Sequence, residues 1–529
     1  MKLYKSIIIL ILAILVLPSC ADFLDERNET RITVNEIYTT NEGISNASVG
    51  LYYLHRRILR FGGNNDSEMF AGLIRGTDIE VSRIGPLGSP AFGFYRPEEL
   101  NRYRYLQTYW NLYYEIIGKA NEIVFYGEQL EDRNFAADRA IGEASYFRAL
   151  SLLFLYERFN NIYLNIVPTT PENFNDERVY TAASKEEVFA QIYQDLDKAI
   201  ELLPVDDMGQ PGRITRGAAR HVKMLSAMWM NNWQEAILQG EAIAESGQYN
   251  LVPLNQLFSS VKYINHPEAI ATWQYFEDLG GSDFQGQFGY AGHRAKALFV
   301  PEYHRVNNGQ RVAVNGGHGR AWLFPNPYLL SLYNQDTDQR YFEFYRHAYV
   351  FTNETAAASR GLQVGDTIPP TGNIQADFQN IHVGLRKFED VESFTVNDSK
   401  GFGDVMQYRY AQTCISLAEA YLMSGNQAKA LEWYNKTWER AGNEPRTEAL
   451  SMSDILDEHA RELALEGHRW AFLKRTGTMV DQIRNYAGEE GYNIEARTNF
   501  QPFNVNWPIP QGQLDIFGTS FPQNDGFPR

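Results

Sequence analysis

The sequence predicts a mainly α protein, in which tetratricopeptide-like helical hairpins form a right-handed superhelical scaffold with a large irregular, loop-rich excursion. Three observations lead to this prediction. Paired apolar stripes at helical spacing lie on either side of a Gly-Asn turn within residues 406–442. Similar pairs recur before residue 250. The segment 250–404 is instead rich in Gly, Asn, Pro and aromatic residues and has little helical periodicity.

The hairpin within residues 406–442 carries the clearest repeat pattern. Ala418, Tyr421, Ala430 and Tyr434 have the small–aromatic spacing of a tetratricopeptide repeat. In that pattern the small residues let two helices approach, and the aromatic rings fill the remaining gaps. Such a pair cannot bury its apolar face alone, so the pattern predicts neighbouring hairpins of the same kind. By itself it indicates packing and no particular function.

Three neighbouring hairpins are predicted in the N-terminal half. Asn41 is expected to cap a helix over residues 42–59, because its side chain can accept a backbone hydrogen bond at a helix start. Ser184 and Glu187 have the spacing of a capping box. Further helices are expected over residues 106–124, 136–159, 188–203, 213–229 and 233–247, and a last one over 454–474.

Composition limits the possible partners. The chain has 529 residues, of which 44% are hydrophobic, so it can bury a large core. Its formal net charge of −17 disfavours nucleic acid or an anionic membrane surface as the main partner, because both would repel it. The aromatic share is 14%, which supplies many rings for packing or for ligand contact.

Residues 1–20 have the pattern of a targeting segment. Two lysines precede a continuous apolar run at 7–17, which is too short to span a membrane as a helix. The run ends in Leu17-Pro18-Ser19-Cys20, which resembles a bacterial lipobox and makes Cys20 the expected lipidated N-terminus. The alternative is an ordinary secretory signal with an incidental cysteine. Cys414 is the other cysteine and is expected in the core.

Catalytic and cofactor signatures are weak. The sequence has no Walker A loop and no H-E-x-x-H, and the run Gly316 to Gly319 does not form a dinucleotide fingerprint. On the predicted last helix Glu462 and Glu466 share a face, which indicates a solvated or salt-bridged structural pair more than a catalytic one. His459 and His468 would lie on opposite faces of that helix and could not share a metal. We expect no cofactor and no metal.

Blocks along most of the chain resemble one family. After the lipobox come Gly212-Arg213-Ile214-Thr215-Arg216-Gly217 and the segment 110–123, and then residues 461–475 with Arg461-Glu462-Leu463-Ala464-Leu465-Glu466-Gly467. The tail adds Asn506-Trp507-Pro508-Ile509-Pro510 and Pro522-Gln523-Asn524-Asp525-Gly526-Phe527. With these blocks, in this order, the chain resembles the SusD/RagB family of outer-membrane nutrient-binding lipoproteins.

The resemblance implies a function in nutrient capture. It implies a lipid-anchored, surface-exposed outer-membrane protein, without enzyme activity, that binds a glycan or oligosaccharide and delivers it to a SusC-like TonB-dependent transporter. A peptide-binding uptake lipoprotein of the RagB kind is one alternative, and a surface glycan hydrolase is another. No nucleic acid partner is implied.

The resemblance also implies a division of the chain. Residues 1–19 would be a lipoprotein signal peptide, residues 20–40 a lipidated N-terminus and tether, and residues 41–529 a single domain. Within that domain the expected parts are a helical scaffold at 41–250 and 405–475, the ligand-facing excursion at 250–404 and a C-terminal tail at 476–529.

Candidate ligand-binding residues come from two loop-rich parts of the chain. Sugar rings stack their C–H faces on aromatic rings, while their hydroxyls need Arg, amide or carboxylate partners. Trp322 is the leading candidate because it follows a Gly-rich run, and its truncation to Ala is expected to weaken binding with little change in melting temperature. The alternative is that Trp322 is buried. The full set of candidates is Phe94, Tyr95 and Asp78, with Tyr290, Arg294 and Trp322.

Overall fold

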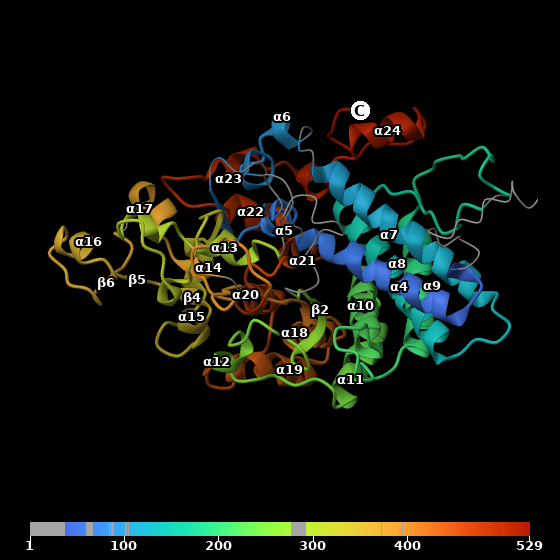
Figure 1. Cartoon of the computed structure of the whole chain (residues 1–529), viewed down its shortest axis with the longest axis horizontal. Helices are drawn as coiled ribbons and strands as arrows, with labels where there is room; N and C mark the ends of the chain where they lie inside the picture. Colours follow the sequence, from blue (N-terminus) through green and yellow to red (C-terminus); the bar gives the residue numbers. More distant parts are fainter. Residues whose placement is uncertain are drawn as a thin grey trace, which may run out of the picture.

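The computed structural model shows a mainly α protein, as predicted (Figure 1). The predicted signal peptide, the lipobox with Cys20, and Tyr290 lie outside the residues that the structure describes. Among the described residues, no helix is both long and apolar enough to cross a membrane. The structure describes residues 37–529 except 60–66, 84, 86–88, 101–102, 104, 171, 277–291, 372 and 394.

The N-terminal half is a stack of antiparallel helices (Figure 1, blue to green). Helix α8 is central, because it packs against α7, α9 and α4 and is buried nearly all round its surface. Helices α10 and α11 form the next hairpin, and α10 packs on α9. The predicted N-terminal hairpins are therefore confirmed. The helices are α4 (Asn41–Arg56), α7 (Tyr105–Glu128), α8 (Phe135–Phe159), α9 (Lys185–Leu202), α10 (Arg216–Trp229) and α11 (Trp233–Glu245).

Side-chain caps fix where these helices begin. The capping box at the start of α9 is confirmed, because the Ser184 hydroxyl accepts from the Glu187 amide and the Glu187 carboxylate accepts from the Ser184 amide at 2.8 Å. The cap of α4 differs from the prediction. Thr40, and not Asn41, accepts from the Gly43 amide at 3.0 Å.

The C-terminal half continues the stack through α18 (Tyr410–Met423) and α19 (Gln427–Arg440), and α18 packs against α11. This is the predicted repeat-like hairpin, and Cys414 is buried within it. The single helix predicted over 454–474 is wrong. Instead α20 (Met452–Glu462) and α21 (Arg469–Arg475) flank a tight irregular segment. The tail adds α22 (Met479–Tyr486), α23 (Glu495–Asn499) and α24 (Gln511–Phe517).

A loop-rich region made of the excursion, the segment between α4 and α7, and the residues just before α18 contains short strands and short helices. Its strands form antiparallel pairs, β1 (Glu80–Ser82) with β3 (Leu323–Pro325), β2 (Ala269–Trp273) with β8 (Val405–Arg409), β4 (Tyr345–Arg346) with β7 (Gly384–Leu385), and β5 (Tyr349–Val350) with β6 (Thr367–Ile368). The short helices are α5 (Glu68–Ile74), α6 (Pro97–Leu100), α12 (Leu254–Leu257), α13 (Ala295–Phe299), α14 (Pro327–Ser331), α15 (Arg340–Glu343), α16 (Glu354–Ala358) and α17 (Ile374–Ile381).

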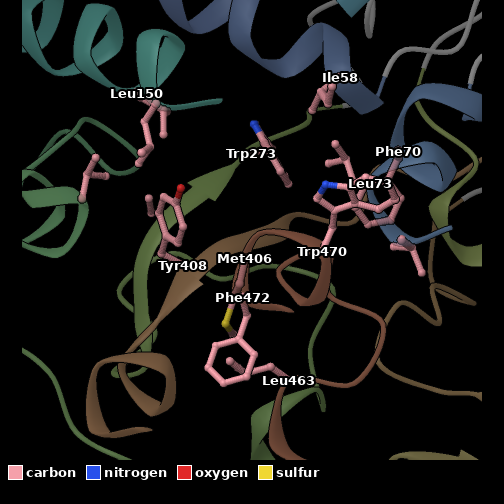
Figure 2. Close-up of a cluster of buried hydrophobic side chains, with 14 of the residues drawn as sticks. Ile58, Phe70, Leu73, Leu150, Trp273, Met406, Tyr408, Leu463, Trp470 and Phe472 are labelled. Atoms are coloured by element: carbon pink, nitrogen blue, oxygen red, sulfur yellow. The ribbon is translucent and has the colours of Figure 1, made fainter. Parts of the chain in front are cut away.

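One hydrophobic core joins the scaffold to the excursion (Figure 2). Leu150 comes from α8, Trp273 from β2, Tyr408 from β8, and Trp470 and Phe472 from α21, and all five side chains are buried. These elements are far apart in sequence, so the core forms only when both halves of the chain come together. Burying large aromatic side chains in this way is a major source of stability.

The core is not completely filled. A cavity of about 100 Å³ lies beside Trp273, Tyr408 and Phe472. His459 and His468 both line it, so the prediction that they lie on opposite faces of one helix is wrong. The reason is the break between α20 and α21, where Leu465 and Gly467 have φ of 59° and 94° and turn the chain.

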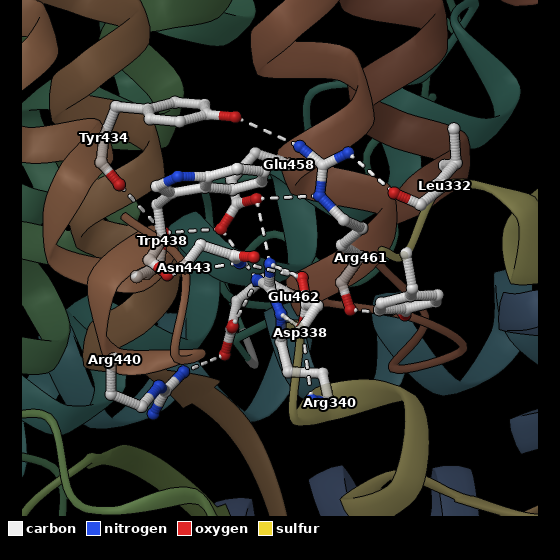
Figure 3. Close-up of polar contacts among 12 residues, drawn as sticks. Leu332, Asp338, Arg340, Tyr434, Trp438, Arg440, Asn443, Glu458, Arg461 and Glu462 are labelled. Carbon is white, nitrogen blue, oxygen red and sulfur yellow. Dashed lines mark hydrogen bonds and ion pairs between the residues drawn. The ribbon is translucent and has the colours of Figure 1, made fainter. Parts of the chain in front are cut away.

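A buried charge network joins α19, α20 and the excursion (Figure 3). The Glu462 carboxylate accepts from Arg340 at 3.0 Å, from Arg409 at 2.6 Å and from Arg440. Arg340 also donates to Glu458 at 2.7 Å. Although burial alone would raise it, the charges of Arg440, Arg409 and Arg340 hold the pKa of Glu462 well below its ordinary value.

Glu466 belongs to the same network. Its carboxylate accepts from Lys387 at 2.6 Å and from Arg409 at 2.8 Å. Burial acts to raise its pKa, but the charges of Arg409 and Lys387 lower the pKa of Glu466 to about 2. The salt-bridged interpretation of Glu462 and Glu466 is confirmed. The solvated one is wrong, because Glu462 is 0% and Glu466 7% exposed.

Candidate functional site

The segment that ends at Trp322 is fixed by backbone hydrogen bonds on two sides. The Trp322 amide donates to the Leu298 carbonyl at 2.8 Å, and its carbonyl accepts from the Arg83 amide at 2.9 Å. Arg320 donates through its amide to the Ala297 carbonyl at 2.8 Å. Residues 320–322 are thus held between the end of β1 and α13. Residues around this segment form a surface that we call the excursion face. Its side chains are those of Arg83, Glu302, His304, Arg305, Arg311, His318, Arg320 and Trp322.

Trp322 lies at the base of the excursion face and is only 8% exposed. The Arg320 guanidinium lies over its ring at 5.5 Å, and that of Arg75 lies 5.8 Å from the ring centroid. The buried alternative therefore describes Trp322 better than a projecting loop. Truncating a buried Trp costs about 3–5 kcal/mol of stability, so an unchanged melting temperature for Trp322→Ala is no longer expected.

Two histidines and an arginine form the rim of the excursion face. Arg311 donates to Nε2 of His304 at 3.2 Å, and the two imidazole rings of His304 and His318 have centroids 6.4 Å apart. His318 is tied to the Asn397 carbonyl through Nδ1 at 2.6 Å, so that nitrogen donates. All three side chains on this rim are half-buried, which leaves part of each open to solvent.

Both rim histidines are held uncharged at neutral pH. Burial and the positive charge of Arg311 lower the pKa of His304 to about 4. Burial also lowers the pKa of His318, and the charges of Arg311 and Arg320 act in the same direction. The His304 acceptor is taken by Arg311 and its Nδ1 is buried, while the His318 donor is taken by Asn397, so Nε2 of His318 is the ring nitrogen that can accept from a sugar hydroxyl.

A second set of charged side chains borders the same face. Arg83 donates to the Arg320 carbonyl at 2.9 Å and pairs with Glu302 at 3.2 Å. Arg305, which is exposed, pairs with Glu302 at 2.5 Å. The face therefore carries arginine N–H donors together with the Glu302 carboxylate. Such a set can hold several hydroxyl groups at once.

Two predicted binding residues are not at a surface. Phe94 and Tyr95 are each 1% exposed, so neither of these candidate ligand-binding residues has its ring open to a ligand. The Tyr95 hydroxyl donates to the Gly76 carbonyl at 2.6 Å, and its ring meets Phe500 edge-on at 4.6 Å. The Tyr95 ring therefore packs the loop against the C-terminal tail, and the Asn499 side-chain amide also donates to the Phe94 carbonyl at 2.9 Å.

Asp78 is also buried, and its carboxylate is paired with an arginine. Its carboxylate accepts from Arg469 through two hydrogen bonds of 2.9 and 2.6 Å, and both residues are buried. It does not reach the excursion face as expected. Arg294 is half-buried, its amide donates to the Ser67 hydroxyl at 3.0 Å, and its charge acts on His318. Of the predicted residues, Arg294 and Trp322 are thus brought to the same face.

The rim residues His304, Arg311 and His318 were missed from the sequence. Each is separated from Trp322 by irregular chain, and no periodic pattern links them. One signal was available. The Gly316 to Gly319 run contains His318, and a glycine-rich loop that carries a histidine often exposes it. Within the described ranges, no group of three or more His, Cys, Asp or Glu side chains is placed to hold a metal ion.

Comparison with known families identifies the class of protein. A model of the SusD family matches residues 285–527, and a model described as "Starch-binding associating with outer membrane" matches residues 90–221. The two matches together reach from the scaffold to the C-terminal tail. The chain belongs to the SusD-like family, which confirms the resemblance found in the sequence.

Individual relatives are distant but nearly full-length. SusD-like proteins P25 and P2 of Formosa agariphila are each 22% identical, over 97% of both chains for P25 and 100% of both for P2. A "Laminarin binding SusD-like protein" is 23% identical with a TM-score of 0.69, over 92% of this chain and 99% of that one. A SusD superfamily protein from Parabacteroides distasonis has a TM-score of 0.72 at 16% identity, over 94% of this chain and 100% of that one. These likenesses establish the fold.

Proposed function

We propose that this protein binds a glycan or its oligosaccharides at the cell surface and does not cleave them. The observation that carries the proposal is the excursion face. There, arginine N–H donors, the His318 ring acceptor and the Glu302 carboxylate lie on the face whose base is Trp322. Donors and acceptors in alternation suit the vicinal hydroxyls of a sugar.

Two similar solved structures support this proposal. One is titled a laminarin-binding SusD-like protein, and surface glycan-binding protein A from Bacteroides thetaiotaomicron has a TM-score of 0.69 at 17% identity over 92% of this chain and 100% of that one. A glycosidase would need two carboxyl groups flanking a cleft at about 5–10 Å. The acidic pair considered from the sequence, Glu462 and Glu466, is instead buried and ion-paired.

The cellular role follows from the same proposal. The family description associates its members with the outer membrane. A lipidated Cys20, followed by the tether 20–40, would hold the domain at the cell surface. The captured glycan would pass to a SusC-like TonB-dependent transporter. Capture and transfer leave the ligand unchanged, so this role needs no catalytic group.

Binding to neutral polysaccharides tests the proposal. Wild-type protein is expected to bind at least one polymer in a panel that includes laminarin, starch and xylan, without releasing reducing sugar. Arg311→Ala combined with His318→Ala is expected to weaken that binding about tenfold, because side-chain hydrogen bonds to the ligand are lost. Isothermal titration calorimetry measures the affinity, and a reducing-sugar assay measures turnover.

The matched control is Arg178→Ala, which removes an exposed arginine far along the chain from the excursion face. It is expected to leave affinity unchanged. Equal affinity for wild type and the double variant would remove the rim residues from the site. Binding of peptides in place of every glycan would favour the peptide-uptake alternative, and reducing-sugar release would favour the hydrolase.

A separate prediction concerns the anchor. Cys20→Ala is expected to leave the domain folded but to abolish lipidation, because the thiol is the acceptor in a lipobox. Metabolic labelling with a fatty-acid probe, followed by membrane fractionation, measures the effect. Cys414→Ala is the control and should keep the label. A Cys20→Ala protein that still takes up lipid would show that this segment is an ordinary secretory signal.

A further inference from the structure

We propose that a polar groove beside β2 is a second binding site, which takes a neutral saccharide chain through its hydroxyl groups. The groove has a volume of about 340 Å³. Its walls are the loop 205–215 between α9 and α10, the segment 248–250 after α11, and the chain that leads into and along β2. It shares no residue with the excursion face.

The free edge of β2 supplies backbone groups to the groove. Within the part of the chain that the structure describes, β2 pairs with β8 as its single strand partner, and residues 269–272 line the groove. The Asn250 amide donates to the Pro267 carbonyl at 3.0 Å, so the segment 248–250 lies beside the chain just before β2. An unpaired strand edge presents a row of N–H and C=O groups along such a groove.

Uncharged polar side chains supply the rest of the lining. Five Asn, Gln and Thr residues of the lining are at least partly exposed. In the described structure, their side-chain polar atoms make no hydrogen bond to another residue. Their donors and acceptors are therefore available to a ligand. These five residues are Gln248, Asn250, Asn265, Thr272 and Gln274.

The charged side chains at the groove are already engaged. Arg213 pairs with Glu143 at 2.6 Å. Asp206 and Asp207 accept from backbone amides of their own loop, each at 2.9 Å. The Arg213 charge is therefore compensated, which disfavours an anionic ligand, while Asp206 and Asp207 keep their negative charge and can accept from hydroxyl groups. A carboxamide has two donors and an acceptor, and this matches the hydroxyl pairs of a neutral sugar.

One wall holds an amide in place. A Cβ at Gly212 would lie 2.1 Å from the Gln274 amide oxygen, so the carboxamide packs directly against the Gly212 backbone. The Gly212 φ of 84° is a left-handed conformation that glycine adopts without strain. Tyr249 and Tyr263, each 7% exposed, also line the groove.

An extended peptide is the competing occupant, since it could add a strand to the free edge of β2. Strand addition gains its specificity from pockets that receive alternate side chains. The groove instead offers amide and hydroxyl groups on both walls. This lining favours a saccharide, whose hydroxyls project along its whole length.

Hydrogen–deuterium exchange locates the ligand directly. Laminarin and soluble starch are the probes, and one of them is expected to slow exchange in the peptides that cover residues 248–250 and 269–274. The combined change Gln248→Ala, Asn250→Ala and Thr272→Val is expected to raise the concentration needed for that protection by about tenfold or more. Gln194→Ala with Gln234→Ala removes two exposed helix-surface amides and should change nothing.

The outcomes separate this proposal from the function assigned above. Protection at β2 that survives Arg311→Ala with His318→Ala supports the groove independently of the excursion face. No protection of β2 with either glucan, or protection that the triple variant leaves unchanged, overturns the groove as a saccharide site. Protection by an extended polar peptide and by neither glucan also overturns it, in favour of strand addition.

Discussion

Replacing Glu462 with Gln is expected to destabilise the protein by about 3–5 kcal/mol, because it removes a charge shared by three buried guanidinium groups. Arg340, Arg409 and Arg440 all donate to this carboxylate, and Glu462 is 0% exposed. Gln keeps the shape of the side chain, so the loss reports charge and hydrogen bonding more than packing. The cations that remain stay buried with less compensation, which is the costly part of breaking such a network.

Urea denaturation followed by circular dichroism measures the change. The matched control is Glu495→Gln, which breaks the pair of Arg96 and Glu495 at 3.0 Å, where the glutamate side chain is 52% exposed. An exposed pair contributes about 0–1 kcal/mol, so this control is expected to be nearly neutral. Similar losses for the two variants would show that the network contributes no more than a surface ion pair does.

Acidification below pH 6.5 is expected to destabilise the protein steeply. Burial lowers the pKa of His55 and of His221 to about 3 and that of His468 to about 4. Burial also holds the pKa of His459 well below its ordinary value. In the unfolded chain these groups titrate near 6.5, so below that pH the unfolded state binds more protons. The free energy of unfolding therefore rises with pH between the folded-state pKa values of about 3 to 4 and the unfolded-state value near 6.5. It falls as the pH drops through this range.

The expected loss of stability depends on how many buried histidines stay neutral in the folded protein. Each histidine that stays neutral in the folded state costs about 1.4 kcal/mol per pH unit below 6.5. Glu80 opposes them, because burial raises its pKa to about 7 and its protonation favours the folded state between pH 7 and 4.5. Below 4.5 Glu466, with its pKa of about 2, adds a further loss as its carboxylate is titrated.

One variant isolates the histidine contribution. His221 is bonded to the Thr413 hydroxyl at 2.9 Å and to the Gln412 side chain at 3.2 Å, and a glutamine could keep such contacts. His221→Gln should reduce the pH dependence of the unfolding free energy by about one proton between pH 6.5 and 5. Its stability relative to wild type should be compared at pH 8, where both residues are neutral. A parallel pH profile would refute the assignment.

The helical hairpins could be predicted because their signal is local. Ala418 lies on α18 and Ala430 on α19, the two helices pack together, and both residues are fully buried, as the small–aromatic spacing indicated. The Ser184 and Glu187 capping box is equally local, since both partners lie within one turn. Periodicity and caps are set by neighbours in sequence, so they can be interpreted without knowledge of the fold.

The predictions that were wrong concern residues whose partners lie far away in the sequence. Asp78 is paired with Arg469 and Tyr95 packs on Phe500, and neither partner can be inferred from the loop that precedes the first long helix. The last helix breaks where Glu466 reaches Arg409 and Lys387, a long-range contact that outweighs local helix propensity. The rim of the excursion face could not be predicted either, because irregular segments of the chain bring His304 and His318 together.

The unfilled space beside His459 and His468 also sets how the folded protein responds to compression. Unfolding eliminates internal voids, and the part of this pocket of about 100 Å³ that is closed to solvent contributes to the volume decrease on unfolding. The volume decrease on unfolding is on the order of tens of mL/mol for proteins in general, and a void adds to it. Hydrostatic pressure should therefore act first where α8, β8 and α21 meet, and it should loosen the junction between the two halves of the chain before it disturbs the filled helical stack.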